Sequence, residues 1–212
     1  FEALLLEALD DAGFPEAAMA RERALAARLG GWAVDFEGQR RASPLSLLIE
    51  QEGAHAFDAP AGRFIVTAKA DRIELRAGHA DVLDFKTGAA PSKKQIETGF
   101  SPQLTLTAAI LHHGGFDGRP LTPRELVYVR VTGRKVPGEA FVRAAEGESL
   151  SLALMALEGL RKRVERFDDP ATPYRSWAAP QFLSERGGDY DHLARLYEWH
   201  VMGAGEADEV GE

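Results

Sequence analysis

The stretch "ADRIELRAGHADVLDFKTG", Ala70 to Gly88, reads as two strands joined by a turn at Gly78. In its second half, Asp84 and Lys86 stand two residues apart where a buried strand prefers apolar side chains. Because successive side chains of a strand alternate, Asp84 and Lys86 project to one face and Leu83 to the other. One face therefore belongs to the core, and the other carries either a salt bridge or a chemical site.

The first of these strands contributes a second carboxylate. Its alternation places Asp71 on the polar face, and in a hairpin closed at Gly78 the carboxylates of Asp71 and Asp84 can converge near the open end. Two buried carboxylates cannot both ionise without a cation, so convergence implies either a shared proton or a bound metal.

A third strand offers two more acids. "LLIEQEGAHAF" contains Glu50 and Glu52 with the same two-residue spacing. Carboxylates with a lysine can hold a divalent ion that activates water against a phosphate, while the lysine orients the water or neutralises developing charge. We expect Glu52, Asp71 and Asp84 to share one cation; for Glu50, a solvent-facing strand residue is the favoured interpretation.

Around this centre, periodicity and turn residues predict an α/β fold, a three-layer core with a mixed β-sheet flanked by helices. The expected helices span Phe1 to Asp11, Glu16 to Arg41, Ser92 to Glu97, Pro102 to His113, Ser149 to Phe167 and Asp189 to His200. The expected strands span Leu45 to Phe57, Arg63 to Leu75, Asp81 to Phe85, Glu125 to Val131 and Glu139 to Arg143, the first three as an antiparallel meander.

Domain organisation follows from these elements. We predict a helical lead-in over 1–43, the core over 44–145, helices packing on the core over 146–202 and an acidic tail over 203–212. Because the chain opens at Phe1 inside a helical pattern, we expect it to be a fragment of a longer polypeptide.

Composition narrows the chemistry. The 212 residues include no cysteine, so thiolate zinc sites and iron–sulfur clusters are excluded and a hard cation such as Mg²⁺, or Mn²⁺ in its place, is the natural candidate. The formal net charge of -8 argues against a surface that coats nucleic acid generally. Without a signal sequence or an apolar run of about 18 residues, a cytoplasmic setting away from membranes is expected.

The spaced elements "ADRIE", "VLDFKTG" and Gln103 in "GFSPQLTLTAAIL" resemble the signature of the PD-(D/E)XK nucleases in their RecB-like exonuclease branch. Together with "LARLYEWH" near the carboxyl end, these segments make the sequence more specifically similar to the carboxy-terminal nuclease domain of alphaproteobacterial AddB subunits. The resemblance implies a Mg²⁺-dependent deoxyribonuclease that cleaves single-stranded DNA during double-strand break repair, beside an AddA-like helicase–nuclease partner.

The resemblance also assigns roles. Asp71 and Asp84 match the family's metal-binding aspartates and Lys86 its catalytic lysine, with the Phe85 carbonyl as a further ligand and Glu52 as the acid of the preceding strand. Gln103 resembles the glutamine of the family's Q-x-x-x-Y motif, which holds substrate or orders the site. The sequence departs from the family at Thr107, which replaces that tyrosine, and it has no histidine before His55.

Several charged residues keep two interpretations. Arg72 either pairs with Glu74 or contacts a phosphate, and Lys93 and Lys94 either meet DNA or are surface charge. Asp81 is interpreted as a turn residue. A non-catalytic module that retains the fold for DNA binding or subunit assembly is the alternative function.

Overall fold

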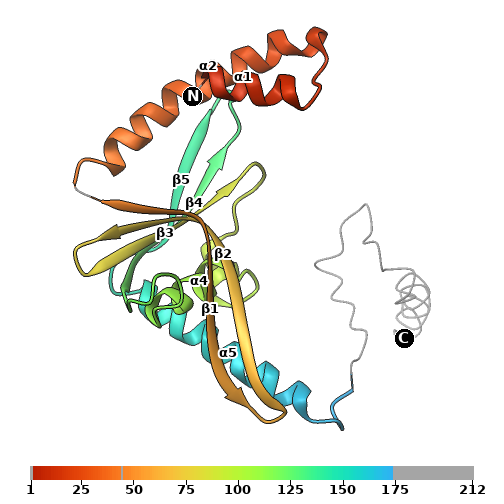
Figure 1. The fold of residues 1–212 in the computed structure, drawn as a ribbon, viewed down its shortest axis with the longest axis vertical. Helices are drawn as coiled ribbons and strands as arrows, with labels where there is room; N and C mark the ends of the chain where they lie inside the picture. Colours follow the sequence, from red (N-terminus) through yellow and green to blue (C-terminus); the bar gives the residue numbers. More distant parts are fainter. Residues whose placement is uncertain (1, 44, 174–212) are drawn as a thin grey trace, which may run out of the picture. The chain divides into compact units, whose positions relative to one another are not determined.

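The computed structural model describes residues 2–43 and 45–173. The chain divides into two compact units, Phe1–Asp168 and Asp169–Glu212, and the elements described here belong to the first. The expected helix over 189–200 and the acidic tail over 203–212 lie outside the described residues. In chain order the elements are α1 (Glu2–Asp11), α2 (Glu16–Arg40), β1 (Ser46–Ala59), β2 (Gly62–Arg76), β3 (His79–Lys86), α3 (Lys93–Glu97), α4 (Gln103–His112), β4 (Thr122–Val131), β5 (Gly138–Ala144) and α5 (Ser149–Asp168) (Figure 1).

One mixed sheet organises these elements, with the strand order β1-β2-β3-β4-β5. The pairs β1/β2, β2/β3 and β4/β5 are antiparallel, whereas β3 and β4 run parallel. Parallel neighbours need a crossover connection, and the chain between them contains α3 and α4. The predicted α/β fold with a mixed sheet, and the predicted meander, are confirmed.

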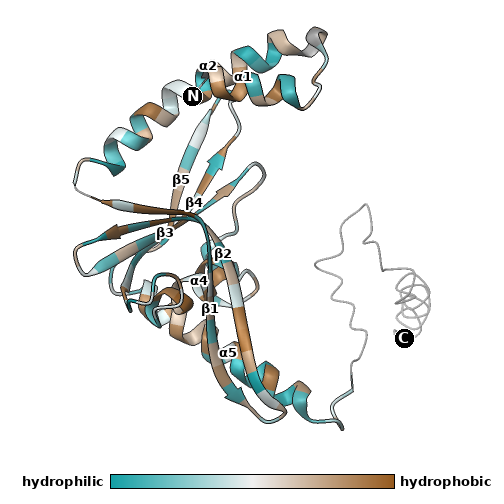
Figure 2. Ribbon diagram, viewed as in Figure 1, coloured by the Kyte–Doolittle hydropathy of each residue, from teal (hydrophilic) through white to brown (hydrophobic). Residues whose placement is uncertain are grey.

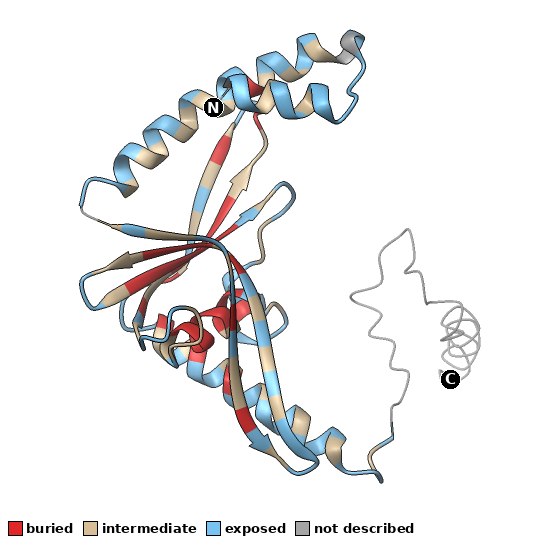
Figure 3. Ribbon diagram, in the orientation of Figure 1, coloured by how far each residue is buried: buried red, intermediate tan, exposed pale blue. Residues whose placement is uncertain are grey.

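Each face of the sheet packs against helices. On one face, Val82 and Tyr128 belong to the main core with residues of α4 and α5. On the other, Leu83 and Val129 pack against Trp32 and Phe36 of α2. Figures 2 and 3 show apolar, buried positions gathered in the middle of the sheet and in α4, with α1 and much of α2 exposed.

This two-sided burial explains the unusual charges of β3. Val82 and Leu83 are both buried, and they face opposite helix layers. Alternation then directs Asp84 and Lys86 to the same side as Val82, at the end of a central strand. The charged pair therefore sits at the end of the main core and not on a solvated outer face.

A network of arginines and carboxylates fastens the carboxyl end of α2 to the sheet. Arg40 binds Glu74, Asp81 and Glu125 at 2.7–2.9 Å, and the side chains of Glu74 and Asp81 are completely buried. Asp81 also binds Arg124 at 2.6 Å. Burial acts to raise the pKa of Asp81, but these arginines outweigh it and hold that pKa below its usual range.

The interpretation of Asp81 as a turn residue is therefore wrong. Asp81 lies inside β3, and the register between β3 and β4 shifts between Ala80 and Val82, next to the position where Arg124 reaches it. Arg76 lies five residues from Asp81 in the chain, but Arg40 and Arg124 lie 41 and 43 residues away, so no local pattern predicted this network.

The β1–β2 hairpin extends well beyond β3. Its register runs from Ser46 opposite Leu75 to Ala59 opposite Gly62, and Glu50 adopts a positive φ of 51° where the pair bends. The loop after α4 secures the edge of β1, because Ala54 donates its N–H to the Gly115 carbonyl at 3.0 Å. Within the described part of the chain, no helix is long and apolar enough to cross a bilayer.

Candidate active site

Asp71 and Asp84 meet where β2 and β3 separate. Arg72 opposite Leu83 is the pair at that end of the β2/β3 ladder, and continuing the register by one residue brings Asp71 opposite Asp84. At this point the Asp71 side chain replaces a backbone carbonyl as the hydrogen-bond acceptor: its Oδ2 accepts the Phe85 N–H at 2.8 Å. The carboxylate of Asp71 is thereby fixed beside the strand that carries Asp84.

Asp84 is the buried acid of the pair, with 4% of its surface exposed. Burial, together with the charge of Asp71, raises the pKa of Asp84 above its ordinary value, although Lys86 opposes the shift. The Oδ2 atom is buried and forms an ion pair with the Lys86 Nζ at 2.6 Å, but it has no well-aligned hydrogen bond among the described residues. A buried carboxylate oxygen in this state favours a cation.

Lys86 is held in place by three different groups. Besides its ion pair with Asp84, its Nζ donates to the Gln103 Oε1 at 3.0 Å and lies 5.6 Å from the centre of the Tyr128 ring. Gln103 is the first residue of α4, so the start of that helix orients the lysine. An ammonium over an aromatic face is stabilised electrostatically.

Tyr128 completes the floor of the site and was missed by the sequence reasoning. It lies opposite Asp84 in the β3/β4 ladder, is completely buried, and has its hydroxyl 3.5 Å from the Ser101 Oγ. Burial first, and then the charge of Asp84, raises its pKa. A signal was present, because Tyr128 and Arg130 repeat in β4 the two-residue polar spacing of Asp84 and Lys86.

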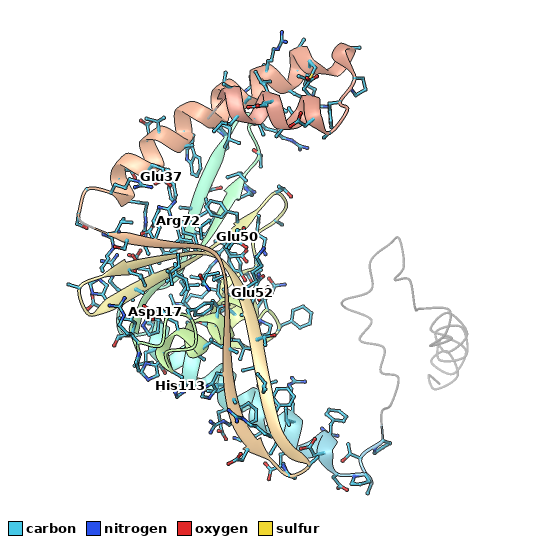
Figure 4. The ribbon with its side chains drawn as sticks, in the orientation of Figure 1. Glu37, Glu50, Glu52, Arg72, His113 and Asp117 are labelled. Carbon is cyan, nitrogen blue, oxygen red and sulfur yellow. The ribbon has the colours of Figure 1, made fainter. Side chains whose placement is uncertain are left out.

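The acids of β1 do not join this group. Glu50 pairs with Lys69 at 2.5 Å, and Glu52 is exposed and lies opposite Lys69 in the register (Figure 4). Nowhere in residues 2–43 and 45–173 do three histidine, aspartate or glutamate side chains come close enough to hold a metal together. The expected convergence of Glu52 with Asp71 and Asp84 is therefore not found.

The remaining candidates are placed as follows. Arg72 pairs with Glu74 at 2.8 Å and with Glu37 on the α2 side of the sheet, so its ion-pair interpretation is the one observed (Figure 4). Lys93 binds Glu148 at 3.1 Å. Lys94 is exposed and, within the described residues, forms no ion pair.

Thr107 occupies the position where the resembling family has a tyrosine. It is 4% exposed and lies in the part of α4 that packs on the sheet. The aromatic ring beside the lysine of this site is that of Tyr128, from β4.

A mixed sheet between helices, with an acidic pair and a lysine at the end of its central strands, defines an α/β domain of the restriction-endonuclease-like class. The sequence model described as the PD-(D/E)XK nuclease superfamily matches residues 1–181, and the chain belongs to that superfamily.

Curated relatives come from Rickettsia and are named "Uncharacterized protein". The relative from Rickettsia bellii is 27% identical over 173 residues, which cover 74% of this chain and 20% of that protein. The relative from Rickettsia felis is 35% identical over 83 residues, 39% of this chain and 10% of its own length. The chain thus spans at most about a fifth of these relatives.

Among solved structures, the one titled "Crystal structure of SSO0001" overlaps with a TM-score of 0.35 at 14% identity, covering 63% of this chain and 55% of that one.

Members of this superfamily generally use divalent metals, so the fit of the site can be tested on its own atoms. The oxygens available are those of Asp71 and Asp84 and the Phe85 carbonyl, and among the described residues the Asp84 Oδ2 is contacted by the Lys86 ammonium alone, at 2.6 Å. Mg²⁺ keeps several waters and is usually bound through one or two carboxylates plus substrate phosphate. The donor set therefore fits a hard cation without a third protein carboxylate.

Proposed function

We propose that this domain is a metal-dependent deoxyribonuclease whose catalytic centre is Asp71, Asp84, Lys86 and Gln103. One observation carries the proposal: Asp84 is buried, burial raises its pKa, and its carboxylate lies between a second carboxylate, that of Asp71, and the Lys86 ammonium 2.6 Å away. A structural ion pair between Asp84 and Lys86 would not require Asp71, and a buried carboxylate beside a second, half-buried one is costly unless a cation or a proton compensates the charge.

Each residue then has a role. Asp71, Asp84 and the Phe85 carbonyl would hold Mg²⁺, with Mn²⁺ as a substitute. Such an ion, when bound, neutralises negative charge on the phosphate and makes a bound water more acidic. Lys86, aimed by Gln103, neutralises charge that develops on the phosphoryl group. Water oxygen forms a bond to phosphorus, the bond to the leaving sugar oxygen breaks, and that oxygen takes up a proton.

The substrate and the setting belong to the same proposal. The resemblance to AddB supports exonucleolytic cleavage of single-stranded DNA in double-strand break repair, next to an AddA-like helicase partner. The net charge of -8 gives the domain little long-range attraction for DNA, which fits a strand that a partner delivers. The short share of the Rickettsia relatives that the chain covers fits a nuclease domain within a larger protein.

A cleavage assay tests the proposal. End-labelled single-stranded DNA is incubated with the protein in Mg²⁺ and in EDTA, beside Asp84→Asn and the control Asp58→Asn, which changes an exposed acid of the β1–β2 hairpin. We expect metal-dependent cleavage that Asp84→Asn lowers by about 100-fold or more, because a ligand lost from the centre costs at least as much as an outer partner. Binding of DNA without cleavage at any Mg²⁺ or Mn²⁺ concentration would favour the non-catalytic alternative.

A further inference from the structure

An irregularity in β5 sets one arginine apart from the rest of the strand. In the β4/β5 ladder Leu126 faces Ala144 and Val127 faces Val142, so Arg143 between them has no partner residue. An extra residue of this kind is a β-bulge, which redirects a side chain and is common beside active sites.

Arg143 is also the unpaired charge of this region. Its guanidinium lies over the Phe141 ring, 4.7 Å from the centroid. Its Nε is buried without a hydrogen bond, and across the described residues no carboxylate pairs with it. Two acids close to it in sequence are already engaged, Glu139 with Arg130 at 2.9 Å and Glu148 with Lys93 at 3.1 Å.

The position of Arg143 connects it to the proposed catalytic centre. Asp84, Tyr128 and Phe141 form one row across β3, β4 and β5. Adjacent strands are about 4.8 Å apart, so this row spans roughly 10 Å from the acid to the ring under Arg143. The charges of Asp84, Lys86 and Arg143 all act on the Tyr128 hydroxyl.

An arginine with an open fork, stacked on a ring and lacking an acid, is suited to a phosphate. The guanidinium binds phosphate oxygens with two parallel hydrogen bonds, and stacking on an aromatic ring keeps its plane fixed. A structural arginine would instead be neutralised, as Arg130 is on the same Phe141 ring.

We infer that Arg143 binds a backbone phosphate of the nucleic-acid strand, next to the phosphate at Asp84 and Lys86, so that the strand runs across β4 toward β5. This inference rests on the proposed function and adds the path of the substrate. It makes Arg143 a substrate-binding residue that no sequence motif indicated.

Binding of a fluorescent single-stranded oligonucleotide, measured by anisotropy in EDTA at several salt concentrations, tests the inference. Each phosphate contact contributes about 0.7 to the slope of log affinity against log salt on single strands. We expect Arg143→Gln to lower the slope by about 0.7 and the affinity by about 5-fold at 0.1 M salt. Arg143→Lys, which keeps the charge, should retain most of the slope.

The control is Arg63→Gln, which removes the same charge from an exposed position eight residues before Asp71 in β2, about 26 Å along the strand. An unchanged slope in Arg143→Gln, or an equal loss in Arg63→Gln, would overturn the inference. A stability change in Arg143→Gln without a change of slope would show that Arg143 only covers Phe141.

The two proposals fail separately. A protein that cleaves DNA with Mg²⁺ but binds it independently of Arg143 keeps the proposed function and loses the strand path. A protein whose binding depends on Arg143 but which never cleaves keeps the path and loses the catalytic role.

Discussion

Replacing Arg40 by methionine tests whether its buried ion pairs hold α2 on the sheet. The substitution keeps an unbranched apolar stem and removes three hydrogen bonds, to Glu74 at 2.9 Å, Glu125 at 2.9 Å and Asp81 at 2.8 Å. Glu74 and Asp81 are completely buried, so water cannot replace the lost donor.

The expected loss follows from that burial. Removing one partner of a buried pair typically costs about 3–5 kcal/mol. Arg76 and Arg124 still contact Asp81, which places this case near the lower end, at about 3 kcal/mol. For a chain of this size, that loss corresponds to a melting temperature lower by about 6–12 °C.

The adjacent residue provides the matched control. Arg41 is 56% exposed and binds Glu37 one helical turn away. Such pairs contribute about 0.3–0.5 kcal/mol, so Arg41→Met should change stability little. Urea unfolding followed by circular dichroism measures both variants. If Arg40→Met lost less than about 1 kcal/mol more than Arg41→Met, the network would not be what fastens α2.

Three further outcomes are expected. Lys86→Met should lower cleavage by about 10²–10⁴-fold while the affinity for Mn²⁺, measured by calorimetry, stays near wild type, because the lysine is not a metal ligand. Equal losses of cleavage and of Mn²⁺ affinity would contradict the separate roles of Lys86 and the aspartates. His55 and His113 stack at 4.2 Å between ring centres, and burial first, then neighbouring positive charges, lowers both pKa values. The folded state therefore binds fewer protons than the unfolded state, so the contribution of the two histidines to stability is complete above about pH 6.5 and declines as pH falls through the folded pKa values. His113→Phe should flatten the pH dependence of the urea midpoint between about pH 7 and 5. An unchanged pH dependence in His113→Phe would contradict this assignment. Gly138→Ala should lower the free energy of unfolding by about 1–3 kcal/mol, because the new Cβ would lie 2.4 Å from an indole atom of Trp32 in α2. Gly31→Ala has open space around its Cβ and should raise the free energy of unfolding by about 0.5–1 kcal/mol. Melting temperatures that shift in the same direction in both variants would contradict the packing argument.

Local periodicity predicted much of the fold. The helix over α2 and the alternation of β3 depend only on neighbouring residues, and the structure contains both. Gly30 and Gly31 lie inside α2, where the packing of Trp32 and Phe36 on the sheet outweighs the small helix-propensity cost of glycine. The domain boundaries at 43, 145 and 202 stay predictions.

The candidate site was predictable where it depends on strand alternation and less so where it depends on register. Asp84 and Lys86 share a face because of their spacing alone. Glu52 was expected beside Asp71, but the register places Lys69 opposite Glu52, two positions further along the hairpin than Asp71. The position of the turn between β1 and β2 fixes that alignment, and the alternation around Glu52 does not.

Long-range partners were harder to predict for the same reason, although the polar spacing of Tyr128 and Arg130 was a signal for β4. Tyr128 faces Asp84 only because β4 returns parallel to β3, and Arg143 is singled out only by a bulge between β4 and β5. Both features arise from how strands pair, which the residues around Tyr128 and Arg143 do not encode.

The central claim is that Asp71 and Asp84 hold a catalytic cation. Crystals soaked in MnCl₂ and measured at the manganese absorption edge test it most directly. The account predicts one anomalous peak within about 2.6 Å of an oxygen from each of Asp71 and Asp84, absent in Asp84→Asn. Ordered Asp71 and Asp84 side chains without a peak between them at saturating Mn²⁺, or a peak that persists in Asp84→Asn, would contradict it.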